Sequence, residues 1–133
     1  MKATRMIPVA MLIVASGWAL QAALAQQQGV KRTELQRYDL SIPGREVIQV
    51  RVDLDPGVTF PKHSHPGEEI IYVLEGVWEY QVEDKEPMRL KAGDVLFVPA
   101  GVKHAAKNLG TGNGSVLATY IVEKGKPLLI PAK

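Results

Sequence analysis

The chain has 133 residues, a length typical of a single domain, and 16 basic against 14 acidic residues give it a formal net charge of only +2. Such a small charge does not provide the basic surface that binding to nucleic acid requires. The absence of cysteine excludes disulfides, thiolate zinc sites and cysteine nucleophiles.

Residues 1–25 are predicted to form a signal peptide that is cleaved after Ala25. Two basic residues, Lys2 and Arg5, precede an apolar run, and Ala23-Leu24-Ala25 fits the small-x-small pattern of a cleavage site. The alternative is an uncleaved membrane anchor, but the run is shorter than the roughly 20 apolar residues that a spanning helix needs. We therefore expect a periplasmic or secreted protein without membrane contact after cleavage. The mature chain would be neutral, with 14 basic and 14 acidic residues, because cleavage removes Lys2 and Arg5.

Residues 26–45 are interpreted as an N-terminal leader or edge segment that is polar and loose over 26–34. The first clear strand follows, in the segment REVIQVRVDLDPG. Its apolar residues alternate with polar ones, and they are Ile48, Val50, Val52 and Leu54. Such alternation gives a strand one apolar and one polar face. Asp55-Pro56-Gly57 has the composition of a turn and ends this strand.

Further short strands, separated by glycine or proline, follow as far as residue 122. The segment EEIIYVLEG is apolar at consecutive positions from Ile70 to Leu74, which predicts a central strand covered on both faces. The segment VWEYQVE alternates again, and MRLKAGD, DVLFVPAG and SVLATYIVEKG read as three more strands. No helical period is present after residue 26. The pattern predicts an all-β sandwich or barrel over residues 46–122, followed by a C-terminal tail over 123–133.

Three histidines are the main candidates for chemistry. His63 and His65 are two residues apart, so on a strand both rings point to the same side, and Glu69 shares their parity. His104 follows a second Pro–Gly turn, from which a return strand would bring it beside the first pair. Three imidazoles and one carboxylate suit Mn, Fe, Ni, Cu or Zn. Taken alone, the pair His63 and His65 also fits ordinary surface histidines.

Two spaced motifs surround these residues. The chain reads G-x5-H-x-H-x3-E-x6-G from Gly57 to Gly76, and G-x5-P-x-G-x2-H-x3-N from Gly93 to Asn108, with 16 residues between the two. In this order the motifs resemble those of the cupin superfamily, and the resemblance covers residues 46–122. The flanking segments are similar to a subgroup of small exported bacterial cupins.

The resemblance implies a single cupin jelly-roll β-barrel that holds one divalent transition metal inside. The implied ligands are His63, His65, Glu69 and His104. Glu68 is then the outer neighbour of this set, with a solvated side chain. The motif glycines fall where strands reverse, and Asn108 fits a turn that its side chain ties to the backbone, without a role in chemistry.

The implied ligand set resembles that of metal-dependent cupin enzymes. We expect an oxygenase-type enzyme acting on a small chelating oxygen compound, and a metal-assisted isomerase or decarboxylase fits as well. The alternative is a non-catalytic module that binds a metal or a small ligand. No catalytic residue is assigned. Five aromatic residues are candidates for the pocket wall, although each also suits plain packing: Tyr72, Trp78, Tyr80, Phe97 and Tyr120.

Two further expectations concern partners. Arg51 and Arg89 are candidates for binding a carboxylate substrate, although arginines on a strand face are commonly just solvated. A homodimer is expected because an unpaired apolar strand edge is a liability, and the PLLIP segment of the tail is a candidate cover for such an edge.

Overall fold

The computed structural model describes residues 27–133, so the predicted signal peptide lies outside the described residues. Ten strands and no helix occur in this range, which therefore contains no helix that could cross a membrane. In chain order the strands are β1 (Val30–Asp39), β2 (Arg45–Leu54), β3 (Thr59–Ser64), β4 (Gly67–Glu75), β5 (Val77–Val82), β6 (Met88–Lys91), β7 (Val95–Val98), β8 (His104–Asn108), β9 (Gly114–Glu123) and β10 (Ile130–Pro131).

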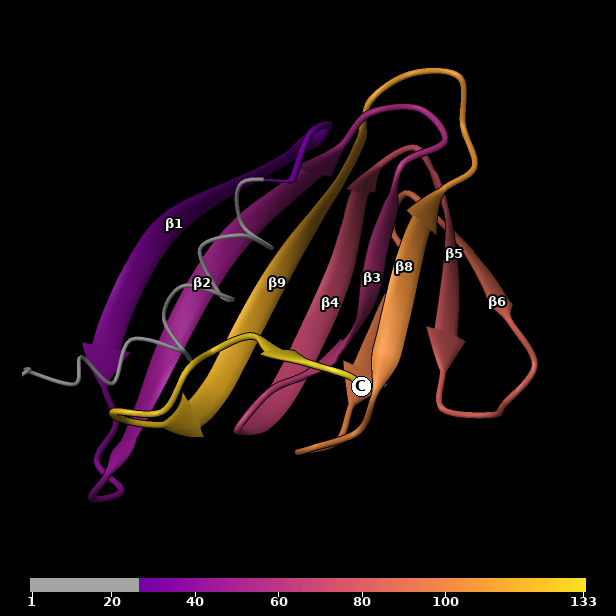
Figure 1. Cartoon of the computed structure of the whole chain (residues 1–133). Coiled ribbons are helices and arrows are strands. Elements are labelled where there is room, and N and C mark those ends of the chain that lie inside the picture. The colour runs from indigo at the N-terminus through magenta and orange to yellow at the C-terminus, as the bar shows by residue number, and fades with distance from the viewer. Residues whose placement is uncertain (1–26) are drawn as a thin grey trace, which may run out of the picture.

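The strands form two antiparallel sheets of five strands each. Sheet A has the order β1-β2-β9-β4-β7, and sheet B has the order β10-β3-β8-β5-β6. Figure 1 shows β2, β9 and β4 side by side in sheet A, although β9 is far from both in the sequence. The pairing of β2 with β9 runs from Arg45 opposite Glu123 to Leu54 opposite Gly114. The predicted all-β fold, a single jelly-roll barrel, is confirmed.

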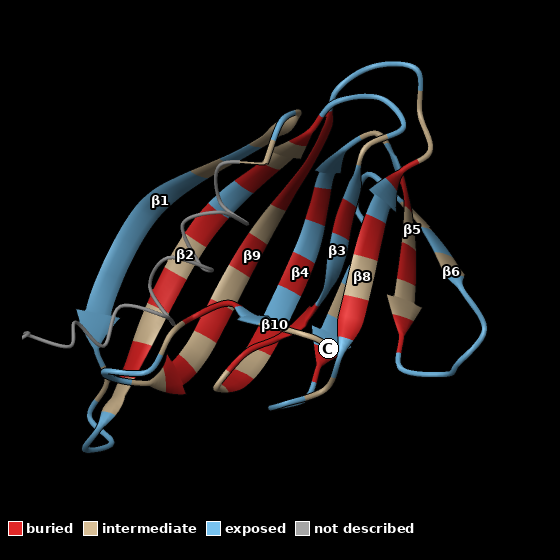
Figure 2. Ribbon diagram, viewed as in Figure 1, coloured by how far each residue is buried: buried red, intermediate tan, exposed pale blue. Residues whose placement is uncertain are grey.

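Alternation of side chains decides which face of each strand enters the barrel. The four apolar residues predicted on one face of β2 are all 7% exposed or less, whereas the residues between them are less buried. Figure 2 shows the same alternation along β9 and β4. From sheet B, Phe60 of β3 and Trp78 and Tyr80 of β5 fill the same core. The prediction of a one-sided strand at β2 is therefore confirmed.

Strand β4 differs from its prediction as a strand covered on both faces. Ile70, Tyr72 and Leu74 are 43%, 45% and 40% exposed, and they alternate with buried side chains. A barrel has one interior, so only one face of each strand can be buried in it. The apolar run of β4 thus marks one buried face and one outer apolar face of sheet A.

Strand β1 occupies part of the segment that was expected to be loose. It begins at Val30, pairs with β2 and forms one edge of sheet A, so the expectation of loose chain is wrong for residues 30–34. Most of its side chains are exposed, which explains why its sequence lacks a clear apolar face. At the other end of the chain, β10 pairs with β3 at the edge of sheet B, where the tail was expected to cover an edge.

Candidate metal centre

Strands of both sheets bring the four predicted ligands together. His63 and His104 lie directly opposite each other on β3 and β8 of sheet B. His65 follows the last residue of β3, and Glu69 lies on β4 in sheet A. All four side chains belong to residues that are 5% exposed or less. The barrel interior thus contains a cluster of polar groups that the sequence places on three separate segments.

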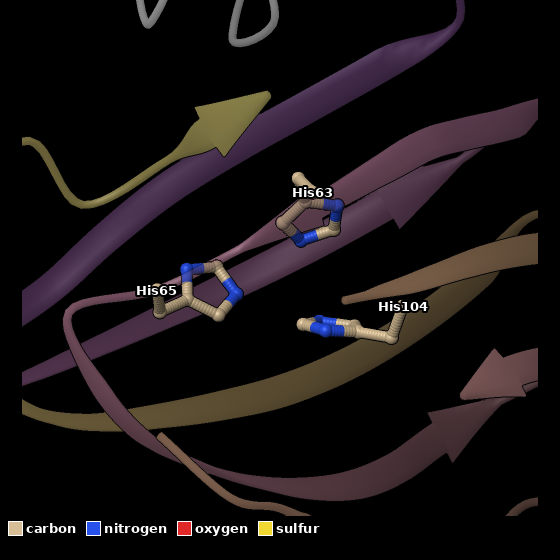
Figure 3. Close-up of side chains that lie close together, drawn as sticks. All are labelled: His63, His65 and His104. Atoms are coloured by element: carbon tan, nitrogen blue, oxygen red, sulfur yellow. The ribbon is translucent and has the colours of Figure 1, made fainter. Parts of the chain in front are cut away.

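The three imidazole rings face one another (Figure 3). Their centroids are between 4.3 and 5.1 Å apart, and one nitrogen of each ring lies within 4.8 Å of those of the others. Glu69 Oε2 lies 3.2 Å from His65 Nε2 and 2.8 Å from His104 Nε2. The histidines therefore converge as the sequence predicted, and Glu69 joins them through contacts with two of the rings.

Backbone carbonyls fix which nitrogen of each ring faces the centre. The Nδ1 atoms of His63, His65 and His104 lie 2.7 to 3.0 Å from the carbonyl oxygens of Pro61, Leu128 and Val102, respectively. A carbonyl oxygen only accepts hydrogen bonds, so each Nδ1 carries the proton that it donates. In a neutral ring Nε2 then has a free lone pair. Metal-binding histidines are held in this way by a hydrogen bond from the other ring nitrogen.

Two atoms at the centre lack a well-directed hydrogen bond. They are His65 Nε2 and Glu69 Oε2, and both are buried. At separations of 2.8 to 3.2 Å, the lone pairs of Glu69 and of neutral histidines repel unless a proton or a cation lies between them. A buried ionised carboxylate without such a partner is costly. The donor set and its unpartnered atoms therefore fit a bound divalent cation.

The titration of these groups follows from their burial and mutual contacts. Burial lowers the pKa of His63 to about 3, and the nearby His104 and His65 add to the effect. Burial alone would raise the pKa of Glu69, but the close contacts with the His104 and His65 rings outweigh it and hold this pKa well below its usual range. Burial alone would lower the pKa of His104, whereas the contact with Glu69 raises it. Without a cation, the contact with Glu69 therefore favours the protonated form of His104.

A family of known proteins shares this arrangement of motifs. The cupin domain family matches residues 50–120, just over half of the chain, and this span contains all four candidate ligands. The chain belongs to the cupin family. Within this family, the chain is 41% identical over 56 residues to the dimethylsulfoniopropionate lyase DddQ of Ruegeria pomeroyi, covering 42% of this chain and 28% of the lyase. It is 37% identical over 73 residues to the oxalate-binding protein of Thermotoga maritima, covering 54% of this chain and 60% of that protein.

The match to these relatives is partial. This cupin spans less than two thirds of the length of either of these curated relatives. Among solved structures, KdgF from Halomonas sp. superposes with a TM-score of 0.58 at 26% identity, covering 69% of this cupin and 78% of that chain. The family is thus established, whereas substrate and reaction are not fixed by the likeness, because cupin barrels host many functions.

A small cavity lies beside the ligands of this cupin. Its volume is about 30 Å³, which is room for one or two water molecules. Of the five aromatic candidates for the pocket wall, Trp78, Tyr80 and Tyr120 line it. Tyr72 and Phe97 instead lie exposed on the outer face of sheet A, so they were wrong candidates. Their parity along β4 and β7 directs them away from the interior.

The arginine that lines this cavity is one that sequence analysis missed. Arg51 pairs with Asp53 at 3.1 Å on the outside, and Arg89 is exposed on β6, so neither candidate reaches the cavity. Arg32 of β1 lines it instead. The sequence carries no clear signal for Arg32, because most residues of β1 are polar and only Val30 and Arg32 are half-buried in the structure.

Two neighbours of the ligands occupy the positions that the motifs implied. Glu68 is only partly buried and lies opposite Ile121 of β9, on the other face of β4 from Glu69. Asn108 is fully buried; its side-chain amide donates to the carbonyls of Leu54 and Gly112, and its oxygen accepts from the Gly110 N–H. The expected structural role of Asn108 in tying a turn is confirmed.

Proposed function

We propose that this cupin binds one divalent transition metal per chain through His63, His65, Glu69 and His104. The convergence of three buried imidazoles beside the Glu69 carboxylate, with His65 Nε2 and Glu69 Oε2 lacking hydrogen-bond partners, carries the proposal. Imidazole and carboxylate donors suit Mn, Fe, Ni, Cu or Zn, and the supply in the cell selects among them.

The proposed activity is that of a metal-dependent, oxygenase-type enzyme acting on a small chelating oxygen compound. When bound, such a metal supplies Lewis-acid or redox chemistry to a ligand that coordinates it. The chain supplies ligands whose orientation is fixed by carbonyls, and largely apolar walls that exclude bulk water. Burial and the nearby Glu69 raise the pKa of both Tyr80 and Tyr120, so their hydroxyls keep their protons and remain able to donate hydrogen bonds to a ligand.

The second candidate function is a non-catalytic module that holds a metal or a small ligand. It is favoured by the composition of the cavity wall, where the described residues provide no acid–base pair separate from the proposed ligands. Turnover separates the two candidates. Oxygen uptake with small chelating substrates is expected for the enzyme, whereas a module binds the same compounds without consuming oxygen.

The test of the metal site uses two adjacent glutamates. Protein purified from its native compartment is expected to contain about one divalent transition metal per chain by elemental analysis. Glu69→Gln is expected to lose most of this metal, because it replaces a buried carboxylate donor. Glu68→Gln, one residue away on the outer face of β4, is the matched control and is expected to retain it. His104→Ala is expected to behave like Glu69→Gln.

Stoichiometric metal in both Glu69→Gln and His104→Ala would contradict the ligand assignment. Equal loss of metal in Glu68→Gln and Glu69→Gln would point to a general loss of structure instead. The thermal unfolding midpoint of each variant is measured to separate these outcomes.

We also propose that the chain is exported and acts in the periplasm or outside the cell. The support is the pattern of residues 1–25, with a basic start, an apolar core and a small-x-small end. Amino-terminal sequencing of the protein from the periplasmic or extracellular fraction is expected to begin at Gln26. A sequence that begins at Met1 would contradict cleavage.

The proposed assembly is a homodimer formed through an outer patch on sheet A. We define this outer patch as Ile70, Tyr72, Val95 and Phe97, in which Ile70 is paired with Phe97 and Tyr72 with Val95 across β4 and β7. Each of these residues is more than two-fifths exposed. Since aromatic side chains bury about 150–250 Å² each, the outer patch offers on the order of 400 Å² of apolar surface.

A second copy of the chain is the occupant that suits this patch. It contains no charged side chain, so a charged partner would find no countercharge in it, whereas an identical apolar patch is self-complementary across a two-fold axis. A standard interface needs about 800 Å² per partner, with an apolar centre and a polar rim. The outer patch would supply the centre of such an interface.

A further inference from the structure

Arg32 occupies a defined place on the wall of the cavity. It is half-buried on β1, and its Nη2 donates to the Tyr120 hydroxyl at 3.3 Å. Its guanidinium carbon lies 5.8 Å from the ring centroids of both Phe60 and Tyr120. Contacts of this length between a guanidinium and an aromatic ring are attractive. These contacts therefore hold the Arg32 side chain at the cavity wall.

The charge of Arg32 is not neutralised by a neighbouring carboxylate. Arg37 pairs with Glu34 and Glu46, and Arg51 pairs with Asp53, but no ion pair of the described residues includes Arg32. Glu69, the acidic residue on the same cavity, is engaged by His65 and His104. A guanidinium has five N–H donors, and the bond to Tyr120 uses one of them.

The rest of the cavity wall strengthens the attraction between the Arg32 charge and an anion. Outside the proposed ligands, the cavity is bounded mostly by apolar and aromatic side chains, with Val52, Leu54 and Val116 among them. Interactions between charges are stronger in such surroundings than in water. The small volume also admits only the end of a compact ligand, the rest of which must extend towards the open side of the cavity.

We infer that Arg32, supported by Tyr120, is a specificity-determining residue that selects a small carboxylate as the ligand of this cavity. The carboxylate lies against the guanidinium, and a second oxygen of the same molecule faces the histidine cluster. This inference rests on the proposed metal site, because a metal beside Glu69 leaves the cavity with a net positive charge that only an anion matches.

The test compares an acid with its neutral amide. Metal-loaded protein is titrated calorimetrically with glycolate and with glycolamide, and glycolate is expected to bind at least about tenfold more tightly. Arg32→Gln is expected to weaken glycolate binding about ten- to hundredfold, the range for a charge-assisted hydrogen-bonded pair. Binding of glycolamide is expected to change by less than about twofold, since it has no charge to lose.

Two further variants make the test specific. Arg37→Gln, on the same strand but away from the cavity, is the matched control and is expected to bind glycolate like the wild type. Arg32→Lys keeps the charge but loses the planar fork, so an intermediate loss is expected, and this variant serves where Arg32→Gln fails to fold. Metal content and the thermal unfolding midpoint are recorded for every variant.

Three results would overturn the role of Arg32. They are unchanged glycolate affinity in Arg32→Gln with full metal content, equal loss of glycolate and glycolamide binding, and loss of metal on substitution. If the wild type contains no metal, it is the proposed function that fails. The comparison of glycolate binding by metal-free wild type and Arg32→Gln then still decides whether Arg32 binds carboxylates.

Discussion

At the scale of the residue, the burial of His63 disfavours its protonated, charged form. Its pKa falls from 6.5 to about 3 in the folded protein, so His63 takes up a proton at a higher pH in the unfolded chain than in the folded one. Stability of the metal-free protein therefore decreases as the pH falls from 6.5 towards 3. Glu69 acts in the same direction at lower pH, because its pKa is depressed and its stabilisation is lost on protonation.

We predict that acid destabilises the metal-free protein mainly through His63. Between pH 6.5 and 4.5, the free energy of unfolding is expected to decrease by about 2 kcal/mol, as measured by urea denaturation after treatment with a chelator. His104 has the opposite sign: its pKa is raised, so its contribution is complete below 6.5 and is lost only at higher pH. His104 therefore does not alter the dependence of the unfolding free energy on pH between 6.5 and 4.5.

A variant isolates this effect. His63→Gln has no titratable group at this position, so its unfolding free energy is expected to change much less over the same pH range. A slope in His63→Gln equal to that of the wild type would show that other groups cause the acid sensitivity.

At the scale of the element, the start of β4 depends on the close approach of β9. A Cβ atom at Gly67 would lie 2.0 Å from the Ile121 carbonyl oxygen and 2.7 Å from the Val122 Cα, so the two strands would have to separate. We predict that Gly67→Ala lowers the free energy of unfolding by about 2–3 kcal/mol in urea denaturation. Metal content is expected to fall as well, because Glu69 lies two residues further along the displaced strand.

A second glycine provides the control for this prediction. No atom lies within 4 Å of a Cβ built at Gly112, and its φ is not positive. Gly112→Ala is therefore expected to leave stability within about 0.5 kcal/mol of the wild type or to raise it slightly. Equal stability of Gly67→Ala and the wild type would contradict the close packing of β4 against β9.

The elements that sequence analysis found, and those that it missed, differ in what surrounds them. Strand β2 was predictable because its apolar residues face the core and its polar residues face outward. The grouping of His63, His65, Glu69 and His104 was implied by the resemblance of the two motifs to those of cupins, because parity along the chain alone did not decide it. Strand β1 and Arg32 were missed because an edge strand with mostly exposed side chains leaves no hydrophobic period. The apolar run of β4 was misread because apolar residues on an outer face look the same in sequence as buried ones.

At the scale of the whole molecule, the two ends of sheet A differ in character. The end at β1 and β2 is mostly polar on its outer face, with Gln36 beside Gln49, whereas the end at β4 and β7 has the outer patch. Large exposed apolar patches on soluble domains commonly mark contact surfaces. The asymmetry localises the proposed dimer contact to one end of the sheet.

We predict that a charge in the outer patch abolishes the proposed dimer. Light scattering coupled to size-exclusion chromatography is expected to give a dimer mass for the wild type and a monomer mass for Phe97→Glu, because a buried unpaired carboxylate opposes association. Ile42→Glu changes an equally exposed apolar residue in the turn between β1 and β2, and it is expected to remain dimeric. A monomeric wild type would contradict the proposed assembly.

The hydrogen bond from His65 Nδ1 to the Leu128 carbonyl joins the cluster to the segment between β9 and β10. A chain truncated after β9 would keep all four donor residues but lose the carbonyl that orients the His65 ring. The geometry of the centre therefore depends on a segment that supplies none of its proposed ligands.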